Sequence, residues 1–138
     1  MSYLICLLNI MKSVVICGSR RFKPEMREFT KKLKELGVNV FEPYLHDGKE
    51  EWSNLSDEYK KFTLLGLTHD HFYKIKMADV VFVFNKDGYS GNSTTLEIGC
   101  AVALGKPIYA LSNDSKEACR NILFKEIIKS PEELIKRL

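Results

Sequence analysis

Short runs of apolar residues recur along the chain, and longer segments with helical periodicity separate them. A short run that is apolar throughout is typical of a strand buried on both faces of a parallel sheet. Four such strands are expected at residues 13–17, 38–41, 80–84 and 108–111. Helices are expected at residues 24–36, 57–77 and 94–104, the second interrupted near Gly66 and restarted at Thr68.

The remaining segments have weaker patterns. Residues 43–56 are predicted to form a polar loop, long enough to have a function of its own. A short edge strand is expected near residues 126–128, and Pro131 suits the first position of a last helix.

The alternation of strands and helices predicts one α/β domain over residues 1–138, with helices on both faces of a parallel sheet of about five strands. Residues 1–10 are expected to be an extension before the first strand. Their apolar stretch is too short to span a bilayer, which takes about 20 residues. Ligands of such sheets bind beyond the carboxyl ends of the strands, so the loops at 18–21, at 85–93 and after Leu111 are expected to line a site.

Charge and cysteine content argue against several classes of protein. Lysine and arginine number 21 and aspartate and glutamate 18, with both signs interspersed, whereas a nucleic-acid surface needs clustered basic residues. The four cysteines have neither CxxC nor zinc-site spacing, which is typical of reduced thiols in a cytoplasmic protein. We therefore expect no nucleic-acid partner, no membrane partner and no cofactor.

The turn after the first strand is a candidate phosphate site. Glycine lets a ligand approach the backbone, and a helix start beside serine and arginine suits an anion. The turn lacks the spacing of a P-loop or a dinucleotide fingerprint. A tight turn with solvated arginines is therefore the open alternative. Its residues are Gly18, Ser19, Arg20 and Arg21.

A stretch rich in glycine and hydroxyl groups leads into the helix expected at 94–104. Glu97 is expected in the first turn, where the helix dipole and free amides hold a carboxylate ionised, as a nucleophile requires. The alternative is structural, because Thr94 and Glu97 have the spacing of a capping box, and spacing alone favours that cap. The candidate substrate-binding residues of this stretch are Gly88, Tyr89, Ser90, Gly91, Asn92 and Ser93.

A third set of candidates is the segment Thr68-His69-Asp70-His71. Asp70 in a first helical turn is an ordinary partner of the helix dipole, with Thr68 as the cap. His69 and His71 are two positions apart and lie on different faces of a helix, and His46 is distant in sequence. No metal site is therefore expected.

Three segments together resemble the nucleoside 2-deoxyribosyltransferase family, which includes the 2'-deoxynucleoside 5'-phosphate N-hydrolases. They are VVICGSR at 14–20, ADVVFV at 78–83 and STTLEIGCAVALGKPI at 93–108. The resemblance implies a flavodoxin-like, three-layer fold of the Rossmann-like type with strand order 2-1-3-4-5. It also implies a small-molecule nucleotide or nucleoside as substrate, and a homodimer or higher homo-oligomer whose neighbouring subunits complete each site.

The resemblance further implies catalytic roles. In the family a glutamate attacks C1' of the sugar, and Glu97 matches that nucleophile. A second acidic group protonates or orients the leaving base. Asp70 is the best match for it, and His71 takes that position in an alternative alignment shifted by one residue.

Substrate contacts follow in the same way. Ser19 with Arg20 or Arg21 matches the loop that holds the 5'-phosphate in the hydrolases. Sugar or phosphate contacts are expected from Ser90, Asn92 or Ser93.

The chain departs from the family at the first strand. Relatives carry a tyrosine there that orients the nucleophile, and this chain has Val15. Tyr89 or Tyr44 is expected to take over that orientation.

The leading interpretation is a nucleotide N-glycosidase acting on (deoxy)nucleoside 5'-monophosphates, because a neutral nucleoside would not require Arg20 and Arg21. One alternative is a nucleoside 2-deoxyribosyltransferase that moves deoxyribose between bases. The other is a non-catalytic nucleotide-binding or sensing module.

Overall fold

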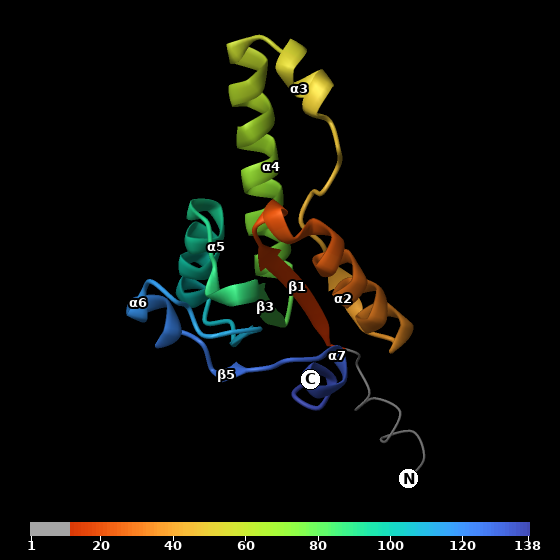
Figure 1. The fold of residues 1–138 in the computed structure, drawn as a ribbon, viewed down its shortest axis with the longest axis vertical. Coiled ribbons are helices and arrows are strands. Elements are labelled where there is room, and N and C mark those ends of the chain that lie inside the picture. Colours follow the sequence, from red (N-terminus) through yellow and green to blue (C-terminus); the bar gives the residue numbers. More distant parts are fainter. Residues whose placement is uncertain (1–11) are drawn as a thin grey trace.

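A computed structural model describes residues 12–138, so the expected extension at residues 1–10 lies outside the described part of the chain. The strands form one five-stranded parallel sheet in the order β2-β1-β3-β4-β5 (Figure 1). The predicted α/β fold and strand order are confirmed, including the short fifth strand. The strands are β1 Ser13–Gly18, β2 Asn39–Phe41, β3 Val80–Phe84, β4 Ile108–Ala110 and β5 Glu126–Ile127.

Helices cover both faces of this sheet. The α-helices are α2 Lys23–Glu35, α3 Lys49–Asn54, α4 Asp57–Met77, α5 Asn92–Ala103, α6 Ala118–Asn121 and α7 Pro131–Ile135. Two short 3-10 turns follow the central strands, η1 at Arg20–Phe22 and η2 at Lys86–Gly88.

Side chains of β1 and β3 alternate between two apolar clusters, because successive residues of a strand point to opposite faces. Val14 and Ile16 pack with the buried residues of α2 and α7 on one face. Val15 and Cys17 pack on the other face, with Ile75 of α4 and Ile98 of α5. This alternation places Cys17 beneath α4 and α5, where the polar residues described below converge.

α4 is one uninterrupted helix, so the predicted break near Gly66 is wrong. The Ser56 hydroxyl caps its start by accepting a hydrogen bond from the Tyr59 amide. Gly66 lies in open space with no neighbouring atom within 4 Å of an added Cβ, so nothing there forces the helix to end. Thr68 and Asp70 lie well inside α4, so neither is in a first turn or at a cap.

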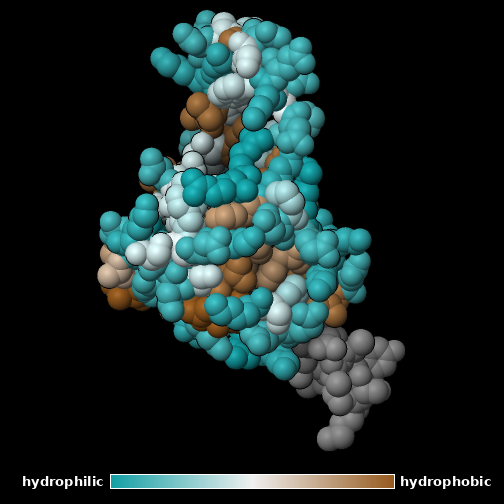
Figure 2. All heavy atoms as spheres, in the orientation of Figure 1, coloured by the Kyte–Doolittle hydropathy of each residue, from teal (hydrophilic) through white to brown (hydrophobic). Residues whose placement is uncertain are grey.

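α4 extends beyond the sheet as an arm, with α3 beside its outer end (Figure 1). The segment at 43–56, predicted as a loop throughout, thus contains a helix. Glu50 and Glu51 in the first turn of α3 complement its dipole. Apolar side chains remain exposed on the arm, among them Phe62, Leu64 and Leu65, and Figure 2 shows apolar surface there.

Two glycines make a matched test of this backbone. Gly66→Ala is expected to raise the free energy of unfolding by about 0.5–1 kcal/mol, because alanine favours a helix and meets no neighbour. Gly88→Ala is expected to lower it by about 2 kcal/mol or more. Gly88 has a φ of +73°, and its added Cβ would lie 2.6 Å from the Asn113 carbonyl oxygen. Urea denaturation measures both changes, and destabilisation by Gly66→Ala would contradict a continuous α4.

Candidate active site

A pocket of about 430 Å³ opens beside the carboxyl end of β1, in the size range of small-molecule sites. Its walls come from the turn after β1, the segment after β2, the inner side of α4 and the first turns of α5. The lining residues are Gly18, Ser19, Arg20, Pro43, Tyr44, Leu64, Leu67, Thr68, Asp70, His71, Phe72, Gly91, Asn92, Ser93, Thr94, Leu96 and Glu97.

The Glu97 carboxylate lies inside this pocket and is largely buried, with its side chain 15% exposed. α5 begins at Asn92 with Gly91 as its N-cap, so Glu97 is in the second turn and the capping-box interpretation is wrong. The expectation of a carboxylate held ionised by a first turn also fails. Burial raises the pKa of Glu97 to about 7, and hydrogen bonding from the Cys17 thiol offsets part of this rise.

His71 lies next to Glu97 and is more deeply buried, with its side chain 8% exposed. Its Nε2 is 3.7 Å from Oε1 of Glu97 and 3.5 Å from Sγ of Cys17. Burial, and then the charge of Lys74, lowers the pKa of His71 to about 4. The imidazole is therefore neutral near pH 7, and the group beside Glu97 is not a cation.

Cys17 is a site residue that sequence reasoning missed. It lies two positions after Val15 on the same face of β1, so the strand places a thiol where its side chain reaches Glu97. Burial, with the nearby Glu97 charge, raises the pKa of this thiol well above its usual range, so it stays protonated and can donate to the carboxylate. The alternation of side chains along β1 could have indicated this residue, because it places Cys17 on the same face as Val15.

The two tyrosines expected to orient Glu97 lie elsewhere. Tyr44 lines the pocket but is more than half exposed. Tyr89 packs edge-on against Phe22 and beneath Arg21, outside the pocket lining. Cys17 and His71 are the residues that contact the carboxylate instead.

Of the two arginines after β1, only Arg20 lines the pocket. Its Nη2 donates to the His46 carbonyl oxygen in the segment after β2. The Arg21 guanidinium stacks over the Tyr89 ring at 3.7 Å from the ring centre, and Arg21 is absent from the lining. Ser19 caps η1 by accepting from the Arg21 amide, and with Gly18 it stays at the pocket.

Only the second half of the stretch at 88–93 lines the pocket. Gly91, Asn92 and Ser93 line the pocket at the start of α5, where the first amides have no partner within the helix. Gly88 packs against Asn113 and Ser115 instead. Three residues of this stretch therefore lie outside the pocket lining, as Arg21 does: Gly88, Tyr89 and Ser90.

Asp70 lines the pocket near its opening, with its side chain 52% exposed. Its carboxylate forms an ion pair with Lys74, one helical turn further on, at 2.8 Å. Asp70 and His71 both reach the pocket, but His71 is the one in contact with Glu97.

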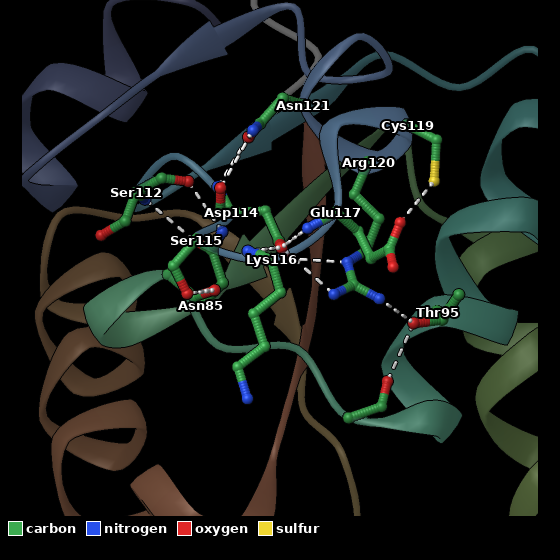
Figure 3. Close-up of polar contacts among 12 residues, drawn as sticks. Asn85, Thr95, Ser112, Asp114, Ser115, Lys116, Glu117, Cys119, Arg120 and Asn121 are labelled. Carbon is green, nitrogen blue, oxygen red and sulfur yellow. Dashed lines mark hydrogen bonds and ion pairs between the residues drawn. The ribbon is translucent and has the colours of Figure 1, made fainter.

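The segment after β4 contributes no lining residue, contrary to the expectation from its position in the sheet. Figure 3 shows the polar contacts of this segment: Asp114 accepts hydrogen bonds from the amides of Lys116 and Glu117 and forms an ion pair with Arg120. Arg120 in turn donates to the Thr95 hydroxyl at 3.0 Å. The segment is thereby held against the outer side of α5, where it fixes the helix that carries Glu97.

The family model for nucleoside 2-deoxyribosyltransferases matches residues 14–130 of the chain. The chain belongs to the nucleoside 2-deoxyribosyltransferase family. It is therefore a member of a family of enzymes, as its first strand and the α5 segment predicted.

Solved structures share the fold of this family member. A 2-deoxyribosyltransferase from Bacillus psychrosaccharolyticus superposes with a TM-score of 0.64 at 18% identity, over 89% of this chain and 90% of that one. The CMP N-glycosidase BcmB from Clostridium botulinum gives 0.52 at 19% identity, over 91% and 96%. A conserved protein from Enterococcus faecalis V583 gives 0.55 at 16% identity, over 93% and 99%. No curated protein sequence matches the chain.

The residues at 12–138 include no helix with the length and apolar character needed to cross a bilayer.

Glu97→Gln tests the buried carboxylate. Because the native pKa of about 7 lies above that of an unfolded glutamate, the ionisation of Glu97 lowers stability progressively as pH rises through 7. Glutamine removes that penalty. The free energy of unfolding of the variant, taken relative to wild type, is therefore expected to rise by about 2 kcal/mol from about pH 5 to about pH 8. Urea denaturation in chelator-treated buffer measures the gain.

The matched control is Glu28→Gln, on the exposed side of α2. It is expected to show no such pH trend. An unchanged difference between Glu97→Gln and wild type across this range would contradict a buried carboxyl group with a raised pKa.

Proposed function

We propose that this protein is a nucleotide N-glycosidase that cleaves the base–sugar bond of (deoxy)nucleoside 5'-monophosphates. The observation that carries the proposal is a buried carboxylate, Glu97, in a pocket that also holds Arg20. The first suits attack on an anomeric carbon, and the second suits a phosphate. The CMP N-glycosidase among the solved structures acts on a nucleotide of this kind.

Glu97 is the nucleophile in this proposal. One carboxylate oxygen forms a bond to C1' as the bond from C1' to the base nitrogen breaks, and the electron pair leaves with the base. The departing base takes up a proton. Water then hydrolyses the glycosyl ester, which releases a sugar phosphate and restores Glu97.

The neighbours of Glu97 position it and set its charge. The Cys17 thiol lies beside the carboxylate, and its Sγ is 3.5 Å from Nε2 of His71. The neutral imidazole of His71 fills the space beside it without fixing the carboxylate in a strong ion pair. Asp70, held by Lys74 at the pocket opening, is proposed to orient the leaving base.

The substrate is proposed to lie with its phosphate on Ser19, Arg20 and the free amides at the start of α5. All of these groups belong to residues that line the pocket, and a helix start suits an anion. α4 contributes both polar and apolar residues to the lining. Leu67 and Phe72 provide a surface that suits a planar base.

Transfer of deoxyribose to another base is the second candidate. It is favoured by the family match itself, whose description is that of a nucleoside 2-deoxyribosyltransferase. The two reactions share the glycosyl ester on Glu97 and differ in whether water or a base resolves it. Adding a free acceptor base to the reaction distinguishes them, because only a transferase converts it to a new nucleoside or nucleotide.

We also propose that the protein is a homodimer or higher homo-oligomer. The exposed apolar residues on α4 and α5 support this, because apolar surface of this kind is typical of subunit interfaces. They include Tyr59, Phe62, Leu64 and Leu65 on α4, and Leu96 and Val102 on α5. Leu64 and Leu96 also line the pocket, so an interface over these faces would border the site.

A cytoplasmic location also remains our proposal. The described cysteines Cys17, Cys100 and Cys119 are all free thiols, which agrees with a reducing compartment.

Base release tests the proposed chemistry. Wild type is expected to release free base from at least one member of a panel of ribo- and deoxyribonucleoside 5'-monophosphates, as measured by chromatography. Glu97→Gln is expected to lower kcat by at least about a thousandfold, because the nucleophile is lost. Glu28→Gln is the control and is expected to keep full activity. Base release that survives Glu97→Gln would contradict the assigned role.

The two arginines provide a second test. Arg20→Ala is expected to lower kcat/KM for a monophosphate by about 10- to 100-fold, because a charge-assisted contact to phosphate is lost. It is expected to leave the matching nucleoside unaffected. Arg21→Ala is the matched control, since that guanidinium stacks on Tyr89 outside the pocket. Equal losses for nucleotide and nucleoside in Arg20→Ala would contradict the phosphate role.

A further inference from the structure

Three side chains with metal-binding atoms converge at the inner end of the pocket. They are Cys17 from β1, His71 from α4 and Glu97 from α5, and one ligand atom of each lies within 4.8 Å of the others. The Sγ–Nε2 distance between Cys17 and His71 is 3.5 Å, and the Nε2–Oε1 distance between His71 and Glu97 is 3.7 Å. The three elements that hold these atoms belong to one packed face of the sheet, so the group is fixed by the fold.

These distances fit the edges of a zinc coordination tetrahedron. Zinc binds sulfur at about 2.3 Å and nitrogen or oxygen at about 2.0–2.2 Å, which places tetrahedral ligand atoms about 3.3–3.6 Å apart. The two measured distances agree with these edges to within a few tenths of an ångström. The third pair, Sγ of Cys17 and the Glu97 carboxylate oxygen, lies within 4.8 Å, so these two side chains move toward each other to seat an ion.

The donor set also fits in charge and type. A thiolate from Cys17 and a carboxylate from Glu97 neutralise a divalent cation in a site that has little contact with solvent. Sulfur, imidazole and one carboxylate favour zinc over magnesium or calcium, which take oxygen ligands. His71 and Glu97 line the pocket, so an ion can enter from it and keep a fourth position open toward it.

We propose that Cys17, His71 and Glu97 form a Zn²⁺ site at the inner end of the pocket, and that the bound ion inhibits the enzyme by occupying the Glu97 carboxylate. Binding displaces the proton of the Cys17 thiol to solvent, so the thiolate bonds to the metal with no change in oxidation state. The inhibitory consequence rests on the proposed function, because it requires Glu97 to be the nucleophile. The metal site itself does not.

Cobalt substitution tests the metal site without any assay of activity. Titration of the full chain with Co²⁺ is expected to produce a sulfur-to-cobalt charge-transfer band in the near ultraviolet and the intense visible bands of tetrahedral cobalt. Added Zn²⁺ should abolish both by displacement. No charge-transfer band, or only the weak visible bands of octahedral cobalt, would overturn the proposal.

Matched variants assign the sulfur ligand. Cys17→Ser is expected to lose the charge-transfer band, while a variant with Cys6, Cys100 and Cys119 all replaced by serine is expected to keep it. The opposite pattern would overturn the assignment to Cys17. Circular dichroism melting shows whether each variant is folded. If Cys17→Ser is unfolded, Glu97→Gln tests the ligand set instead. Loss of the Glu97 ligand should weaken Co²⁺ binding at least about tenfold. Unchanged binding in Glu97→Gln would overturn the proposed ligand set.

Zinc inhibition of base release is measured separately. Zn²⁺ is expected to stop base release by wild type, and a chelator is expected to restore it. If zinc binds and base release continues, the inhibitory role is wrong although the site exists. If wild type releases no base from any nucleotide, the proposed function fails, and the cobalt spectra still decide the metal site.

Discussion

The chemistry of the site depends on the burial of one carboxylate between a strand and two helices. Glu97 lies on the face of the sheet where Cys17 of β1, His71 of α4 and Ile98 of α5 pack together. Removing a carboxylate from water disfavours its charged form, and this burial explains the raised pKa of Glu97. The neutral imidazole and the protonated thiol beside it have the same physical cause, since both lie in the same desolvated space.

The two faces of the sheet have different roles: one carries an apolar core, and the other also leads to the pocket. The face covered by α2 and α7 is filled by aliphatic and aromatic side chains, including the stacked pair of Phe29 and Phe82. The face covered by α4 and α5 continues beyond the strand ends into the pocket. Arg120 and Asp114 hold α5 from outside through Thr95, so the helix that carries Glu97 is fixed on two sides.

Much of this arrangement could be predicted from local patterns. The apolar runs at 13–17 and 80–84 gave the central strands, because burial on both sides of a sheet requires them to be apolar throughout. The candidate site was harder, since a start of α5 at Asn92 instead of Thr94 moves Glu97 from a cap into a buried second turn. The contact between Cys17 and His71 joins residues 54 positions apart, and no local pattern encodes such a pair.

Trapping the glycosyl–enzyme intermediate tests the central claim, that Glu97 is a buried nucleophile, most directly. A 2'-fluoro-substituted nucleoside 5'-monophosphate slows both steps, because fluorine destabilises the positive charge that develops at C1' in their transition states. Mass spectrometry of the digested protein should then find a fluorosugar phosphate attached to the peptide that contains Glu97. Attachment to another residue, or turnover of the true substrate without any trapped ester, would contradict the account.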